Sequence, residues 1–191
     1  MIKTLLASLV IATSMGTALA AAEKDNTPPS GFSSLFNGKD LTGWKADDKT
    51  KEHWKVANGV LAYSGKYRSL VTEKDFKNFI MQVDFKIQKG ADSGIFLRGR
   101  PQVQIWDNPE GSGGLWNDRV KALKKADNPI GEWNHFEIHL EKGNRVTVFL
   151  NGEKVVDGFE KKNLPATGPL VLQHHGNPLW FKNIYIKELP E

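Results

Sequence analysis

The sequence contains no cysteine among its 191 residues, so disulfide bonds contribute nothing to its stability. A lipid-modified N-terminal cysteine is excluded for the same reason. Hydrophobic residues make up 39% of the chain, an ordinary fraction for a globular protein. The fold must therefore be held together by the packing of these side chains.

Blocks of like charge are also missing. The formal net charge is +4, and the charges are scattered rather than gathered into a basic stripe. Lys124 and Lys125, with Lys121 nearby, are interpreted as solvated loop lysines. A nucleic-acid-binding protein normally shows clustered lysine and arginine, so we predict no nucleic-acid partner.

Long apolar runs are absent after the first twenty residues. Those residues place Lys3 before the short apolar run 5–12 and end in Ala18-Leu19-Ala20. This order is typical of a secretory signal peptide, and the run is too short to span a bilayer. We predict a signal peptide at 1–20, a flexible or extended leader at 21–30 and a single domain at 31–191. The protein is expected to be periplasmic or secreted, without a membrane span or lipid anchor.

The dominant hydrophobic period after residue 30 is two, which indicates half-buried β-strands. Runs of this kind occupy residues 54–57, 60–63, 79–87, 133–140, 145–150, 153–156 and 180–187. Asn58-Gly59 and Asn151-Gly152 separate neighbouring runs and suit two-residue type I′ hairpins, because both residues tolerate positive φ. The pattern predicts an all-β sandwich or jelly roll.

Two finer predictions concern local structure. In 180–187, alternation places Trp180, Lys182, Ile184 and Ile186 on one face of a regular strand. Residues 117–126 are the best helical candidate, and no convincing helix exceeds a turn or two.

A row of amides beside an indole marks residues 102–106. In a regular strand, Gln102, Gln104 and Trp106 share one face while Val103 and Ile105 face the core. Amides both donate to and accept from hydroxyls, and an indole stacks on the apolar face of a sugar ring. The row therefore favours a carbohydrate-binding face, although a solvent-facing strand that happens to carry glutamines remains the alternative.

The glycine-rich segment 111–114 lacks the strand–helix context of a phosphate-binding loop. We interpret it as a mobile loop whose following residues, Leu115 and Trp116, could close over a ligand.

Ordinary glycoside hydrolysis needs two carboxyl groups that flank the scissile bond. Sandwich-fold glycosidases often carry them at positions i, i+2 and i+5 or i+4 of one strand. Here two of these positions are Gln102 and Gln104, and only Asp107 is acidic. Because an amide is neither nucleophile nor general acid, this mechanism is disfavoured.

Histidines supply other candidate bases. His174 and His175 are adjacent and so point to opposite sides of a strand; packed or exposed structural roles are the alternative. His135 and His139 share a strand face with Glu137 between them, where a solvated face is favoured over a metal site.

Several motifs, in this order along 31–188, together resemble the 3-keto-disaccharide hydrolase domain family. They are Leu35–Trp44, Trp54–Leu61, Ser93–Arg98, Val103–Asp107, Gly131–Asn134, Val148–Gly152, Leu172–Gly176 and Trp180–Ile184. The resemblance implies a concanavalin A-like jelly-roll β-sandwich of two antiparallel sheets with a sugar-binding concave face.

The resemblance also implies a hydrolase or lyase that acts on 3-keto-glycosides or 3-keto-disaccharides by base-assisted elimination and hydration. Asp107, His174 and His175 are then the candidate catalytic residues. The candidate substrate-binding residues are Arg98, Gln102, Gln104, Trp106, Trp116 and Gln173.

The chain departs from the family pattern at Gln102, where glutamate is usual, and at Lys182, where arginine is usual. Gln102 keeps a non-catalytic carbohydrate-binding protein of the same fold as the alternative function. The expected partner is a carbohydrate in either case. No cofactor is predicted, a divalent metal is left open, and the sequence makes no prediction of oligomeric state.

Overall fold

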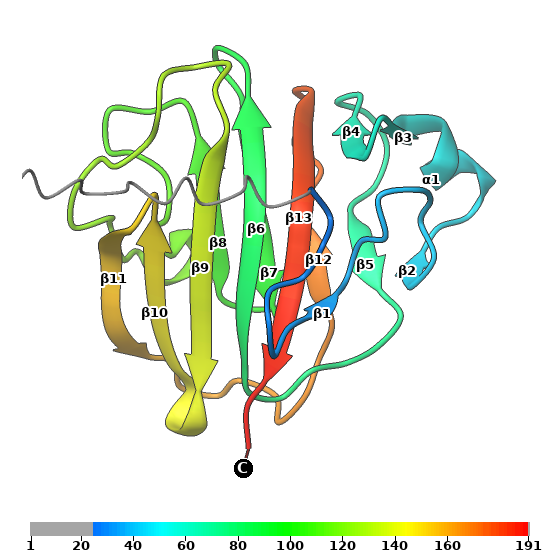
Figure 1. Cartoon of the computed structure of the whole chain (residues 1–191). Helices are drawn as coiled ribbons and strands as arrows, with labels where there is room; N and C mark the ends of the chain where they lie inside the picture. Colours follow the sequence, from blue (N-terminus) through cyan, green and yellow to red (C-terminus); the bar gives the residue numbers. More distant parts are fainter. Residues whose placement is uncertain (1–24, 191) are drawn as a thin grey trace, which may run out of the picture.

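The computed structural model describes residues 25–190 and shows two antiparallel sheets packed face to face (Figure 1). The predicted signal peptide at 1–20 and the first part of the predicted leader lie outside the described residues. No helix within 25–190 is long and apolar enough to cross a membrane. The predicted all-β jelly-roll sandwich is confirmed.

The larger sheet has eight strands in the order β11-β10-β9-β6-β13-β4-β3, with β1 paired to β13. Their bounds are β1 Ser33–Ser34, β3 Trp54–Ala57, β4 Val60–Tyr63, β6 Phe79–Ile87, β9 Asn134–Glu141, β10 Arg145–Leu150, β11 Glu153–Glu160 and β13 Leu179–Glu188. Asn58, Gly59, Asn151 and Gly152 all have positive φ, as the predicted type I′ hairpins require.

The smaller sheet has five strands in the order β2-β5-β12-β7-β8. Their bounds are β2 Trp44–Lys45, β5 Leu70–Thr72, β7 Asp92–Leu97, β8 Gln102–Trp106 and β12 Leu170–Leu172. Apart from β7 and β8, the paired strands of this sheet are far apart in sequence, so the sheet forms only when the whole domain folds.

Helical structure is confined to one short α-helix, α1 (Asp48–His53), and the 3₁₀ turns η1 (Trp116–Asp118) and η2 (Lys142–Asn144) within the described chain. The helix predicted over 117–126 is wrong, because Arg119 adopts positive φ and ends η1 after one turn. The sequence does carry a start signal for α1: the Asp47 carboxylate accepts hydrogen bonds from the Thr50 N–H and hydroxyl.

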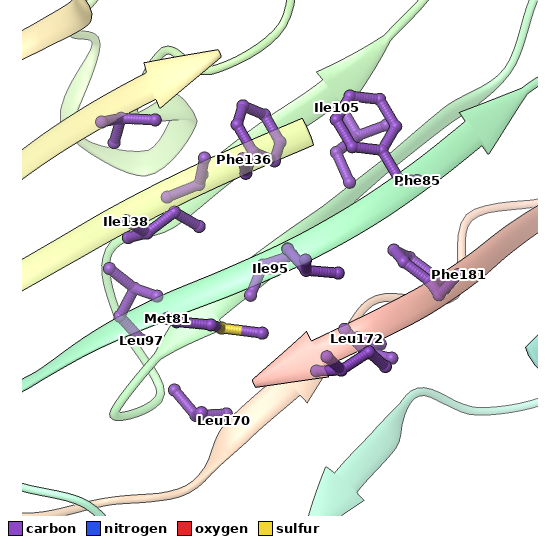
Figure 2. Close-up of a cluster of buried hydrophobic side chains, with 14 of the residues drawn as sticks. Met81, Phe85, Ile95, Leu97, Ile105, Phe136, Ile138, Leu170, Leu172 and Phe181 are labelled. Atoms are coloured by element: carbon purple, nitrogen blue, oxygen red, sulfur yellow. The ribbon is translucent and has the colours of Figure 1, made fainter. Parts of the chain in front are cut away.

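The core lies between the two sheets and is built from the inward residues of both (Figure 2). The larger sheet contributes Met81, Phe85, Phe136, Ile138 and Phe181, and the smaller sheet contributes Ile95, Leu97, Ile105, Leu170 and Leu172. Phe85 and Phe136 stack with ring centroids 4.8 Å apart. Because the inward positions are filled by apolar side chains, polar residues at alternate positions face outward on each sheet.

Strand β13 departs from the predicted alternation. Alternation predicts Trp180 on the same face as Ile184 and Ile186. Instead, Phe181 is buried in the core with these two residues. The register with β6 shifts between Lys182 and Tyr185, and Asn183 in this interval has φ of 51°. This bulge inserts a residue and reverses the faces, so the prediction of one regular strand is wrong.

The described end of the predicted leader is hydrogen-bonded to β13. Asn26 exchanges bonds with Asn183, and the Lys182 ammonium lies 2.8 Å from the Asp25 carboxylate. Residues 25 and 26 are thereby placed on the outer face of the larger sheet.

Candidate functional site

The candidate site lies on the outer face of the smaller sheet, where β7, β8 and the end of β12 meet. Register pairs Phe96 with Gln102 and Gly94 with Gln104. Val103 and Ile105 are fully buried in the core, so both glutamines face outward, as predicted. Gln173 follows β12 and donates its backbone N–H to the Gly94 carbonyl, which brings a third amide beside them.

Gly94 lies at the centre of this arrangement. A Cβ at this position would come within 2.4 Å of Gln102 Nε2 and 2.7 Å of its Cγ. The amide of Gln102 therefore occupies space that any other residue at 94 would fill. The glycine of the Ser93-Gly94-Ile95 motif thus has a packing reason, since it lets the glutamine lie flat over the sheet.

The three glutamines and Asp92 form one hydrogen-bonded group, which we call the amide cluster. Gln102 Nε2 donates to Gln104 Oε1 at 3.0 Å and to Gln173 Oε1 at 2.8 Å. Gln104 Nε2 donates to Asp92 Oδ1 at 2.6 Å. Gln102 and Gln104 are each only 3% exposed, so their polar atoms must find partners within the protein.

Donor capacity remains in the amide cluster after these bonds are counted. Both hydrogens of Gln102 Nε2 are used. Gln104 Nε2 uses one of its two, and Gln173 Nε2 makes no hydrogen bond to another described residue. Two amide nitrogens can therefore donate to a ligand oxygen above the sheet.

Asp92 joins the amide cluster to His175. The carboxylate Oδ2 lies 3.6 Å from His175 Nδ1, and both side chains are partly exposed. Asp92 was not among the predicted site residues. The available signal was its period-two spacing from Gly94 along the strand, which places it on the same face, but its pairing with Trp106 depends on register.

The adjacent histidines diverge, as predicted. His174 turns toward Ser69. The Ser69 hydroxyl lies 3.0 Å from His174 Nδ1 and accepts a hydrogen bond from the His174 backbone N–H. Only His175 reaches the amide cluster through Asp92.

A cavity of about 530 Å³ opens beside Gln104. Its walls include Trp106 and Trp116, whose rings meet nearly at right angles with centroids 5.2 Å apart. The Trp106 indole N–H donates to the Gly111 carbonyl at 2.6 Å, which fixes this ring. Cavities of this size hold small ligands, and the structure thereby brings Trp106, Trp116 and Gln104 together.

The glycine-rich segment 111–114 is packed rather than free. All four residues are buried, and Gly113 and Gly114 exchange backbone hydrogen bonds with Gln104 at the edge of β8. A Cβ on Gly113 would lie 2.5 Å from Val155, and one on Gly114 would lie 2.7 Å from the Val120 carbonyl. The interpretation of this segment as a mobile loop is wrong, because it forms the wall that holds Trp116.

Two predicted site residues lie away from the amide cluster. Asp107 is exposed and accepts the Gly90 N–H at 2.9 Å, so it caps a turn. Arg98 lies beyond the opposite end of β7, where its guanidinium donates to the Ala166 carbonyl at 2.6 Å and to Asn144 Oδ1. Arg98 is 3% exposed, and this burial lowers its pKa by disfavouring the charged form.

The histidines of the larger sheet belong to closed polar pairs. His135 Nδ1 lies 2.6 Å from Asp84 Oδ1, and His139 Nε2 lies 2.8 Å from Glu137 Oε1. Within residues 25–190, no three histidine, aspartate or glutamate side chains converge closely enough to hold a metal ion.

Solved structures with the same architecture include carbohydrate-active proteins. A crystal structure described as a putative glycosyl hydrolase from Parabacteroides distasonis matches with a TM-score of 0.73 and 28% identity, covering 87% of this chain and 100% of that chain. The carbohydrate-binding module CBM66 from Bacillus subtilis matches with a TM-score of 0.53 and 10% identity, covering 83% and 96%. The similarity to CBM66 is one of fold alone.

The sequence itself defines the family. A family model described as the 3-keto-alpha-glucoside-1,2-lyase-like domain matches residues 31–187, so the chain belongs to this family. The 3-keto-disaccharide hydrolase of Bacteroides thetaiotaomicron is 24% identical, over 94% of this chain and 87% of that protein. The resemblance predicted from the ordered motifs is confirmed.

Proposed function

We propose that this protein cleaves 3-keto-glycosides by elimination followed by hydration, at the amide cluster. The observation that carries the proposal is the convergence of a carboxylate–histidine pair with spare amide donors beside a cavity lined by tryptophan. Membership of the family supports the substrate class.

The chemistry requires one base rather than two carboxylates. A ketone at C3 acidifies the C2–H bond; a base takes this proton, and the electron pair forms an enolate. The enolate expels the C1 oxygen substituent, which takes up a proton, and leaves a C1–C2 double bond. Water then adds its oxygen to C1 and a proton to C2, so the net reaction is hydrolysis without oxidation or reduction.

His175 is the proposed base, and Asp92 is the residue that orients it. An imidazole can accept a proton on one ring nitrogen while a carboxylate orients the other. The distance of 3.6 Å is longer than a hydrogen bond, and we expect it to shorten when substrate excludes water. The earlier assignment of Asp107 and His174 as bases is not retained in this proposal, since each is engaged elsewhere.

The amides of Gln104 and Gln173 are the proposed donors to the enolate oxygen. Amide N–H groups already fixed in place stabilise developing charge without reorganising. Gln102 orients both of them, because it donates to each and has no hydrogen left for substrate. Its amide therefore suits a positioning role. Since Asp92 and His175 supply only two ligand groups, no proposed step passes through a metal.

A non-catalytic carbohydrate-binding role is the second candidate. Gln102 favours it, because an amide replaces the carboxylate usual at this position in the family. We further propose that the protein is exported to the periplasm or secreted, on the strength of its predicted signal peptide.

The deciding experiment compares a 3-keto-glucoside with its unoxidised parent, with and without added divalent metal. We expect release of the ketosugar from the first only, together with exchange of the C2 hydrogen for solvent deuterium, followed by NMR. Binding without either signal would establish the second candidate instead. If turnover, hydrogen exchange and binding are all absent, both candidate functions are overturned.

A further inference from the structure

The cavity beside the amide cluster carries a charge that no ion-pair partner within residues 25–190 balances. Its charged lining consists of Glu110, Lys121 and Arg119. Glu110 and Lys121 form an ion pair with each other. Arg119 is exposed and makes no ion pair within residues 25–190. One positive charge is therefore left facing the cavity.

The backbone at Arg119 is unusual for an arginine. Its φ of 57° and ψ of 29° lie in the left-handed region, where a Cβ is unfavourable. Most other non-glycine residues with positive φ in the described chain are asparagines, which tolerate this conformation. A residue that is locally disfavoured at the rim of a cavity indicates a use for its side chain.

Trp116 forms the aromatic wall next to this arginine. It is 56% exposed, and among the large apolar residues of the described chain only Leu123 is more exposed. The Arg119 N–H donates to the Trp116 carbonyl at 3.1 Å, so η1 fixes the spacing of the two residues. An exposed indole and an exposed guanidinium that line the same cavity match a ligand that is both a sugar and an anion.

We propose that Trp116 and Arg119 form a subsite for a leaving group that bears a carboxylate, such as a uronic acid unit. This inference rests on the proposed function and names its substrate class. A single unbalanced cation matches the single charge of a carboxylate better than the nearly double charge of a phosphate. Trp116 and Arg119 line the same cavity as Gln104, which belongs to the amide cluster, so the group expelled from C1 would be held in this cavity.

The test uses two 3-keto-glucosides that differ only at the leaving group, one a glucuronate and the other its neutral uronamide. We expect kcat/KM to favour the acid by about tenfold, the size typical of one charge-assisted hydrogen bond at a partly exposed site. Arg119→Gln should abolish this preference, because it removes the positive charge from the cavity and keeps an amide in its place. Arg100→Gln, at an exposed arginine beyond the far end of β7, is the matched control.

Equilibrium binding of the two unoxidised glycosides, by calorimetry, separates this inference from the proposed function. Tighter binding of the acid that disappears in Arg119→Gln supports the subsite even without turnover. Equal affinity for acid and amide, or a preference that survives Arg119→Gln, would overturn it. Arg119→Gly adds a second readout, because it should raise the melting temperature while it removes the preference.

Discussion

The outer faces of the two sheets use the same kinds of residue in opposite ways. Each carries an aspartate beside a histidine, at least one glutamine amide, and tryptophans. On the larger sheet, Asp84 is fully engaged: one oxygen lies 2.6 Å from His135, and the other accepts from Asn183 at 2.7 Å. On the smaller sheet, one Asp92 oxygen accepts a hydrogen bond from the Gln104 amide at 2.6 Å, and the other lies 3.6 Å from His175.

The tryptophans follow the same contrast. The Lys86 ammonium lies 5.0 Å from the Trp133 ring and 5.1 Å from the Trp180 ring, so the protein itself provides the contacts to these indoles. Trp116 on the other face stays exposed at a cavity. Residue type alone therefore does not identify a site; unused donor capacity next to open space does.

The largest difference in activity is expected between substitutions of the two aspartates. Asp92→Ala should lower kcat on a 3-keto-glucoside by about a hundredfold or more, because the base loses its orienting carboxylate. Asp84→Ala on the opposite face should change kcat less than about twofold, although it costs stability by leaving polar groups unpaired. Rates and melting temperatures of both variants check this comparison. Equal losses of activity would show that the smaller sheet holds no site.

A smaller effect is expected from filling the space above Gly94. Gly94→Ala should destabilise the fold by about 1–3 kcal/mol, because the new Cβ collides with the Gln102 amide. Adding Gln102→Ala should recover part of this loss, since the clash is removed. Urea unfolding of the single and double variants measures the coupling, and additive changes would contradict the packing argument.

The smallest effect concerns Glu137 on the larger sheet. Burial raises the pKa of Glu137, but hydrogen bonds from Gln82 and His139 outweigh it and leave the pKa below its usual value of 4.5. A depressed pKa stabilises the fold above the unfolded-state pKa, and this contribution is lost as pH falls through the folded-state pKa. Its size should be under about 1 kcal/mol, because the site is partly exposed.

Glu137→Gln should therefore be less stable than the wild type at pH 7, and the two should converge toward pH 3. Gln82→Leu, which removes one of the donors, should show the same trend more weakly. Urea unfolding across this pH range supplies the measurement, and a difference that stays constant with pH would contradict it.

Much of the fold could be predicted from local signals. The ranges of β3, β4, β6 and β10 coincide with the predicted strands, because apolar residues recur at alternate positions in each and turn residues bound them. The errors lie where the backbone leaves regular geometry. Positive φ at Asn183 reversed the faces of β13, and positive φ at Arg119 ended the predicted helix.

The candidate site could be predicted only in part. Gln102, Gln104 and Trp106 follow from the alternation of one strand, and His175 and Gln173 from the family resemblance. Asp92 and Arg119 were missed because neither belongs to a local chemical pattern. Arg98 and Asp107 are adjacent in sequence to site strands, but their side chains satisfy carbonyl, amide and turn groups elsewhere.

The sequence by itself determined the sandwich, the hairpins, the outward amide row and the family, because these depend on period, turn residues and ordered motifs within short stretches. Only the tertiary structure decided which groups meet. Pairing of β12 with β7, and of β7 with β8, brings Gln173, Gly94 and Gln104 side by side and places Asp92 opposite Trp106. Such contacts depend on strand register across distant segments, and a one-residue slip would have turned every one of them to the other face.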